Sequence, residues 1–297
     1  MRALLSSAPL GETRWIHRLG PNPPLLDSTL ADDVAATLRQ CGVDDIFAPA
    51  DDPLADTSCI EPVDAIGLRG TDPVVVLVVS GPVRFDPRPL RRALALRGSG
   101  CAIALLPRGR RSSLPRVATD PLGGVELIQP AATDSPVTNL RDTGVRIAGA
   151  DIAMSVLAAG LDTAALASQT TLVSETTSCR WQRDLLTPES FLICCYELLT
   201  GQAGEWYGGC GTAPGSVVHP SVESPRDECG NVWLAEGVTV GEDTTLSRSV
   251  LLSGASVGAG CRLNGCLLLP GSSVADGADM SDKYLKIIGT DGEPSNG

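Results

Sequence analysis

The C-terminal part of the chain repeats every 17 residues, and this period constrains the fold more than any other feature of the sequence. Valine followed by a small residue recurs at that interval, as Val240-Gly241, Val257-Gly258 and Val274-Ala275. A larger apolar side chain follows each pair by six residues, at Leu246, Leu263 and Met280. A further row matches Ser249–Leu252 to Cys266–Leu269. Units this short cannot bury an apolar face alone, so we expect them to stack on one another.

The repeat predicts a solenoid with short strands that meet at corners. A period of 17 residues holds three six-residue steps with one corner shortened, and each step carries one inward aliphatic residue. The pattern resembles the hexapeptide repeats of left-handed parallel β-helices, and we expect such a β-helix over residues 206–290. Val217–Val222 is the expected opening step, and Glu223–Asn231 is an expected inserted loop. Residues 291–297 are expected to form a flexible tail.

Strand and helix signals alternate over residues 1–205. Leu30, Val34 and Leu38 have helical spacing, and Asp27-Ser28 before them offers an N-cap. Other elements are expected as buried strands at Val74–Val79 and Cys101–Leu106, and as helices at Asp151–Ala159 and Pro188–Thr200. Alternating strands and helices predict an α/β, Rossmann-like domain with mainly parallel strands. The boundary to the β-helix is expected in the Gly-rich stretch Gly201–Gly215.

Charge and composition exclude some classes of partner. The 297 residues hold 35 acidic and 23 basic side chains, a formal charge of −12. The negative electrostatic potential of such a chain repels nucleic acid and anionic membrane surfaces, so we expect neither as a partner. No apolar run approaches the roughly 18 residues of a membrane span, and Met1–Leu10 lacks the core of a secretory signal. We therefore expect a soluble, cytoplasmic protein.

Ten cysteines and two histidines do not form a recognisable metal-binding pattern. Cys194 and Cys195 are adjacent, Cys261 and Cys266 are five apart, and no C-x-x-C occurs. In a reducing cytoplasm a buried cysteine serves as a small apolar side chain. The cysteines are therefore interpreted as structural.

Several segments resemble the sugar-nucleotide pyrophosphorylases, a nucleotidyltransferase family, and mannose-1-phosphate guanylyltransferase-like proteins in particular. Asp184–Phe191 is similar to the family motif D-I-G-T-P-E-S-Y, and it is followed by a β-helix as in that family. The other matching segments are Thr13-Arg14, Pro24–Leu26, Val74–Gly81, Gln129-Pro130, Pro136–Asn139 and Thr143–Val145. The resemblance implies a trimmed nucleotidyltransferase domain followed by the β-helix. It also implies an enzyme that joins a nucleoside triphosphate to a sugar-1-phosphate and releases pyrophosphate.

The resemblance assigns roles to four residues of this chain. Arg14 is the expected phosphate contact, Asn139 and Gly144 are the expected substrate contacts, and Asp184 is the expected ligand of Mg²⁺. Mg²⁺ is the implied cofactor if the chain is active, and none is implied otherwise. Structural alternatives are that Asp184 caps the helix that starts near Thr187 and that Arg14 is an ordinary loop residue.

Other positions depart from the family pattern. Leu10 and Glu12 replace the two glycines of the phosphate-binding loop, and the signature Lys falls on Pro23. The first Mg²⁺-binding Asp falls on Pro82, and the Lys of E-K-P falls on Gln129. Transfer chemistry needs these cations and carboxylates to neutralise charge on the phosphates. The departures predict a catalytically degraded protein.

Three functions remain open from the sequence. The first is a regulatory, ligand-sensing or scaffolding subunit that binds a nucleotide sugar or sugar phosphate, and that forms a homo-oligomer or pairs with an active paralogue through the β-helix. The second is an active nucleotidyltransferase that uses Asp184 and Arg14. The third is a hexapeptide-repeat acyltransferase that uses His219, for which a role at a corner or cap of the β-helix is the structural alternative.

Overall fold

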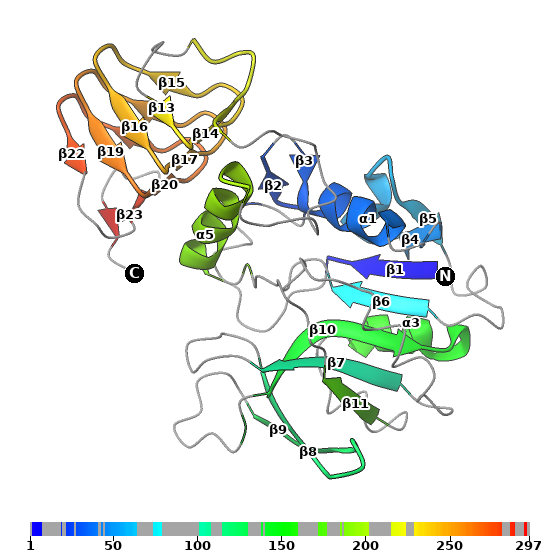
Figure 1. Cartoon of the computed structure of the whole chain (residues 1–297). Coiled ribbons are helices and arrows are strands. Elements are labelled where there is room, and N and C mark those ends of the chain that lie inside the picture. Colours follow the sequence, from blue (N-terminus) through cyan, green and yellow to red (C-terminus); the bar gives the residue numbers. More distant parts are fainter. Residues whose placement is uncertain are drawn as a thin grey trace. The chain divides into compact units, whose positions relative to one another are not determined.

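The computed structural model divides the chain into two compact units, Met1–Pro23 with Leu30–Thr187 and Pro24–Thr29 with Pro188–Gly297. Figure 1 shows both units. The residues that the structure describes are 2–7, 19, 22–26, 28–40, 43, 45–63, 74–78, 101–107, 115–129, 138, 140–159, 172–176, 185, 187–201, 215–223, 229–280, 286–288 and 294–295.

The first unit is built on one sheet, which has nine strands in the described part of the chain. Its main path runs β11-β7-β10-β6-β1-β4-β5, and the hairpin β8-β9 is attached to β10. The strands are β1 (Arg2–Ser6), β4 (Asp45–Pro49), β5 (Glu61–Val63), β6 (Val74–Val78), β7 (Cys101–Pro107), β8 (Arg116–Thr119), β9 (Val125–Gln129), β10 (Leu140–Ala148) and β11 (Leu172–Thr176). The strands expected at 74–79 and 101–106 are confirmed as β6 and β7.

The sheet is mixed rather than mainly parallel. The β1 strand pairs in parallel with β4 and β6, and β11 pairs in parallel with β7. The β10 strand runs antiparallel to β6, β7 and β8. The expectation of mainly parallel strands is therefore wrong around β10, because β10 enters the sheet between β6 and β7 in the opposite direction.

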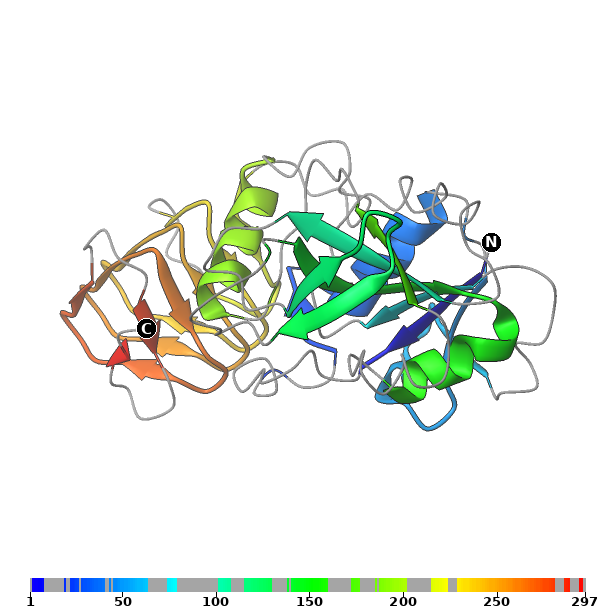
Figure 2. The ribbon, with the colours of Figure 1, turned by 90° about the horizontal axis from the view of Figure 1, so that it is seen from below.

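Helices of the first unit lie on both faces of this sheet. The helices are α1 (Leu30–Gln40) and α3 (Ala150–Ala159), with a short 3-10 helix, η2 (Pro53–Asp56). Figure 2 shows α1 and α3 on opposite faces. Ala153 and Val156 of α3 pack with Leu4, Val74 and other buried side chains in one apolar core.

The predicted helical spacing of α1 is confirmed, but its N-terminus is capped from further upstream. Leu30, Val34 and Leu38 are all buried. The Asn22 side-chain oxygen accepts the Ala31 N–H at 2.9 Å, and the carbonyl of Pro23 accepts the Leu30 N–H at 2.9 Å. Asn22 therefore supplies a capping bond at this end of the helix, and Asp27 of the expected cap lies outside the described residues.

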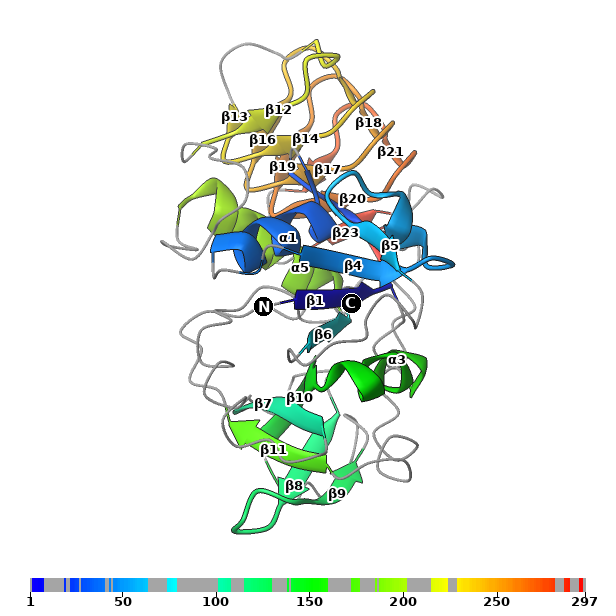
Figure 3. The same ribbon diagram turned by 90° about the vertical axis from the view of Figure 1, so that its right-hand side faces the viewer.

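The second unit contains a parallel β-solenoid. Its strands are β12 (Val217–Val218), β13 (Cys229–Gly230), β14 (Trp233–Leu234), β15 (Thr239–Val240), β16 (Thr245–Ser247), β17 (Val250–Leu251), β18 (Ser256–Val257), β19 (Arg262–Asn264), β20 (Cys266–Leu268), β21 (Ser273–Val274), β22 (Asp279–Met280) and β23 (Lys286–Ile288). They form three sheets, β12-β14-β17-β20-β23, β13-β16-β19-β22 and β15-β18-β21. Figure 3 shows strands of all three sheets around the solenoid.

The register of these sheets confirms the 17-residue period. Val240 pairs with Val257, which pairs with Val274, at intervals of 17 residues. The same step separates Leu246, Leu263 and Met280. The inward side chains form one apolar column that includes Leu234, Leu251 and Leu268. The left-handed sense and the hexapeptide division of each coil stay predictions.

Hydroxyl groups join successive coils at buried corners. The Thr244 hydroxyl donates to the Gly258 carbonyl at 2.7 Å and accepts the Cys261 N–H at 3.1 Å. Ser249 makes the same kind of contact, since its Oγ accepts the Cys266 N–H at 3.1 Å. At the corners, these hydroxyl groups supply hydrogen-bond partners for backbone N–H and C=O groups that have no partner within a sheet.

Helix α5 (Pro188–Leu199) belongs to the second unit and packs beside the solenoid strands. The Phe191 ring lies 6.4 Å from the Trp233 ring of β14. Proline suits the first turn of the helix, and Gly201 ends it with a φ of 70°. The units therefore divide at Thr187, upstream of the expected boundary near residue 205.

Two short strand pairs complete the second unit. Strands β2 (Pro24–Leu25) and β3 (Ser28–Thr29) pair antiparallel with each other. Strand β24 (Pro294–Ser295) pairs antiparallel with β23. Two residues of the segment expected to be a flexible tail thus extend a sheet of the solenoid.

None of the helices in the described part of the chain combines the length and the apolar character that a membrane crossing requires.

Gly241→Ala is expected to destabilise the solenoid. A Cβ at Gly241 would lie 2.7 Å from Ala259 Cα in the next coil and closer still to two backbone atoms there. The coils must then move apart, at a cost of about 1–3 kcal/mol. Thermal unfolding followed by circular dichroism measures this loss.

Gly230→Ala is the matched control, because a Cβ at Gly230 meets nothing within 4 Å. Its effect is expected to stay within about 0.5 kcal/mol. Equal unfolding temperatures for the two variants would contradict the close approach of the coils.

Candidate functional site

The predicted site residues divide into those that the structure describes and those that it does not. Gly144 lies on β10, and Pro23 precedes β2. Arg14, Asn139 and Asp184, as well as Pro82, lie outside the described residues, so their expected roles stay predictions. The site that can be built therefore centres on β10.

A bulge interrupts β10 at Gly144. Asp142 pairs with Leu105 of β7, but the next pair joins Arg146 to Ile103, so β10 has two extra residues at this point. Gly144 has a φ of 78°, which favours glycine. Its N–H donates to Asp142 Oδ1 at 2.9 Å, as in an Asx turn. The bulge presents an irregular backbone segment at the position where the resemblance expects substrate contacts.

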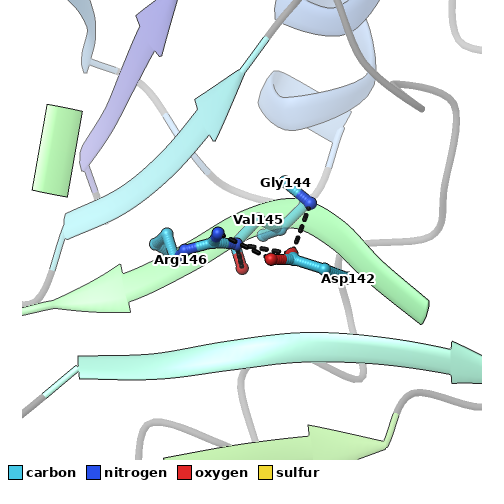
Figure 4. Close-up of polar contacts among 4 residues, drawn as sticks. All are labelled: Asp142, Gly144, Val145 and Arg146. Carbon is cyan, nitrogen blue, oxygen red and sulfur yellow. Dashed lines mark hydrogen bonds and ion pairs between the residues drawn. The ribbon is translucent and has the colours of Figure 1, made fainter. Parts of the chain in front are cut away.

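A buried ion pair closes the bulge (Figure 4). Arg146 Nη1 donates to Asp142 Oδ1 at 2.7 Å, and Arg146 Nη2 donates to Asp142 Oδ2 at 2.8 Å. The side chains are 1% and 0% exposed. Such a bidentate pair is strong because both hydrogen bonds are charge-assisted. Both carboxylate oxygens of Asp142 are thus engaged, and Asp142 is a poor candidate for a Mg²⁺ ligand.

Two further arginines lie beside the bulge on the neighbouring strand and on β10 itself. Arg116 of β8 is the direct register partner of Arg141 of β10. Arg116 is 4% exposed and Arg141 is fully buried. Gln129 of β9 is the register partner of Arg116 on its other side. The three residues form one row across β9, β8 and β10.

A carboxylate binds the C-terminal end of β1, which precedes in sequence the segment Leu10–Arg14 that resembles the phosphate-binding loop. Asp52 Oδ2 accepts the Ser7 N–H at 2.9 Å and the Ser6 hydroxyl at 3.2 Å. Asp52 Oδ1 accepts the Leu54 N–H at 3.0 Å and caps η2. Family loops bind phosphate through free backbone N–H groups, whereas Ser7 directs its N–H to a negative charge.

Pro23 is buried and carries no charge at the position of the family's signature Lys. Its carbonyl oxygen is engaged by the first residue of α1. In the described structure, Pro23 therefore accepts a hydrogen bond at the start of α1.

His219 lies at an exposed corner of the solenoid. Its Nδ1 accepts the Ser221 N–H at 3.2 Å and lies 2.8 Å from Ser221 Oγ. Ser221 Oγ in turn accepts the Gly237 N–H at 3.0 Å. When Nδ1 accepts, the ring proton of neutral imidazole is on Nε2. This geometry agrees with a role at a corner of the solenoid.

Cys59, Cys194, Cys195, Cys261 and Cys266 are free thiols. Four of them are buried. Burial and a hydrogen bond to Asp32 raise the pKa of Cys59 to about 11. This thiol therefore stays protonated at neutral pH and is a poor nucleophile. Among the described residues, no group of Cys, His, Asp or Glu has the arrangement of a metal site.

Comparisons with known proteins identify the fold. No protein-family model matches the chain, and a comparison with curated sequences finds no relative. A solved structure described as a glucose-1-phosphate thymidylyltransferase from Bacillus anthracis, in complex with sucrose, matches with a TM-score of 0.50. Identity is 14%, and the match covers 72% of this chain and 97% of that chain. The chain shares the nucleotidyltransferase fold.

The sequence motifs predict Gly144 as a substrate contact, which stays a prediction, and they do not point to the charged residues around it. Asp142, Arg146, Arg141 and Arg116 were not singled out, because charged side chains are rarely fully buried. The sequence of this segment gives little signal, because Arg141 and Asp142 are adjacent and only Val145-Arg146-Ile147 alternates at strand spacing. The more specific likeness to guanylyltransferases stays a prediction.

Asp142→Asn is expected to destabilise the first unit by about 3–5 kcal/mol, because it leaves the Arg146 guanidinium buried without a counter-charge. Adding Arg146→Gln to this variant is expected to recover much of the loss, since the two side chains are then neutral and can still form a hydrogen bond. Urea unfolding measures both effects. A loss below about 1 kcal/mol in Asp142→Asn, the range of an exposed pair, would show that the pair does not hold the bulge.

Proposed function

We propose that this chain binds a nucleotide sugar or a sugar phosphate and does not transfer nucleotidyl groups, and that it acts as a regulatory, ligand-sensing or scaffolding subunit. The observation that carries the proposal is a nucleotidyltransferase fold in which a buried, uncharged Pro23 stands where the resemblance expects the signature Lys.

The chemistry of transfer supports the loss of activity. Nucleotidyl transfer needs cations and metal-bound carboxylates that stabilise charge on the phosphates during the reaction. Pro23 and Pro82 supply neither a cation nor a carboxylate. The carboxylate of Asp142, which lies closest in sequence to Gly144, is already neutralised by Arg146. The described part of β10 therefore offers no free carboxylate for Mg²⁺.

Two observations favour retained binding. The bulge at Gly144 lies on the strand where the resemblance places substrate contacts, and a buried ion pair keeps its shape. The structural neighbour was determined in complex with sucrose, so a protein of this fold holds a sugar. Residues Arg14 and Asn139 are the further contacts that we propose for the ligand.

The solenoid is the surface that we propose for assembly, either with a second copy or with an active paralogue. Within the described residues, β21 and β22 are each the last strand of a sheet and pair on one side only. Edge strands of this kind present backbone N–H and C=O groups that another chain can pair with. We place the protein in the cytoplasm, in keeping with the composition and the fold.

The alternative is an active nucleotidyltransferase in which Asp184 holds Mg²⁺ and Arg14 contacts the phosphates. One observation favours it: Asp184 lies in the segment that best matches a family motif. A single carboxylate binds Mg²⁺ weakly, which makes this the second choice.

Incubation with a nucleoside triphosphate, a sugar-1-phosphate and Mg²⁺ is expected to release no pyrophosphate above the level of a boiled sample. Glucose-1-phosphate and mannose-1-phosphate are tested with each common triphosphate. We expect no pyrophosphate release because the side chains of Pro23 and Pro82 carry no charge.

Asp184→Asn separates the two proposals. Pyrophosphate release by the unmodified chain that disappears in Asp184→Asn would contradict the proposed function and establish the enzyme. Release that persists in Asp184→Asn indicates a contaminating activity and leaves the expected result for this chain unchanged.

A further inference from the structure

The row formed by Arg116, Arg141 and Gln129 lies on one face of the sheet. Register partners on adjacent strands share a face, and successive residues along a strand alternate between faces. Val117 and Leu140, the neighbours of Arg116 and Arg141, belong to the apolar core that contains α3. The row therefore lies on the face opposite that core, and opposite the ion pair of Asp142 and Arg146.

Arg116 is the residue of this row whose charge lacks a counter-charge. The described structure gives its side chain one hydrogen bond, from Nη1 to the Thr138 carbonyl at 2.9 Å. Its Nε is buried and has no hydrogen-bond partner. The residue as a whole is 4% exposed, so little water reaches its side chain. No described carboxylate pairs with it.

This arrangement is unfavourable as it stands. A buried charge needs a counter-charge or several strong hydrogen bonds, and a single carbonyl supplies neither. Arg141, whose side chain has an interaction of its own, lies directly opposite in the strand register. An anion bound at Arg116 would supply the counter-charge that the Arg116 side chain lacks. A phosphate group suits the position, since its oxygens accept paired N–H bonds from arginine.

We propose that Arg116 and Arg141 form an anion subsite that holds a phosphate group of the bound ligand, an inference that rests on the proposed function. Gln129, the third member of the row, occupies the place that the resemblance gives to the Lys of E-K-P. The positive charge in this row is carried by Arg116 on the adjacent strand β8 and by Arg141 on β10 beyond it. The subsite lies on β10 three residues from Gly144, which places the phosphate next to the segment proposed to contact the sugar.

The test compares the full chain with Arg116→Gln in thermal unfolding, with inorganic phosphate as the probe and sodium chloride at equal ionic strength as the reference. Without phosphate, Arg116→Gln is expected to unfold at the same temperature as the unmodified chain or higher, because an uncompensated buried cation has been removed. With phosphate, the unmodified chain is expected to gain several degrees and Arg116→Gln almost nothing, so that the order reverses.

Two variants control the comparison. Arg39 is an exposed arginine that donates to one carbonyl, that of Cys59, at 2.8 Å, so Arg39→Gln removes a similar contact without a buried charge. It is expected to respond to phosphate as the unmodified chain does. Arg116→Lys keeps the positive charge and is expected to retain part of the stabilisation by phosphate. This variant shows whether a lost response in Arg116→Gln comes from the lost charge or from misfolding.

Binding of glucose-1-phosphate and of a nucleotide sugar is measured with the same proteins to identify the source of the phosphate. An affinity at least tenfold weaker in Arg116→Gln for one of these ligands supports the subsite and names its source. An equal phosphate response in Arg116→Gln and the unmodified chain, or no response in either, overturns the subsite. An Arg116-dependent phosphate response without binding of any sugar phosphate or nucleotide sugar supports the subsite and overturns the proposed function.

Discussion

The sheet of the first unit depends on the ion pair between Asp142 and Arg146. These residues lie on β10, which joins β6 and its parallel neighbours to β7, β8 and β11. Two extra residues in β10 would shift the pairing with β7 unless the backbone bends at a defined point. Asp142 fixes the position of this bend, because the same carboxylate accepts the Gly144 N–H and binds the Arg146 guanidinium. The charge pair thus keeps one strand in register with neighbours on both sides.

The solenoid could be predicted from the sequence because its register follows one repeated interval. A coil contacts only the coils next to it, so the spacing of Val240, Val257 and Val274 translates directly into strand pairing. The strands β8, β9 and β10 could not be predicted in this way. Their order depends on contacts between distant segments, and buried Arg116 and Arg141 stand where apolar residues are the usual sign of a strand. Gly144 was predicted from a motif, whereas the charges that shape its surroundings have no motif.

The fold and the chemistry are separate properties of this chain. Its similarity to a nucleotidyltransferase is a similarity of backbone arrangement, and catalysis would depend on side chains placed on it. Pro23 contributes a carbonyl to the start of α1, and Asp52 binds backbone groups at the end of β1. Both residues have structural roles in the described part of the chain. Among the described residues of the unit, Arg116 of β8 and Arg141 and Arg146 of β10 are buried.

The central claim is that a ligand binds without the metal that transfer would require. Isothermal titration calorimetry of a nucleotide sugar into the full chain tests this claim most directly, once in Mg²⁺ and once in EDTA. The account predicts binding with the same dissociation constant in both buffers. Binding that is lost or at least tenfold weaker in EDTA would show that a metal bridges the ligand to carboxylates of this chain, and would contradict the account.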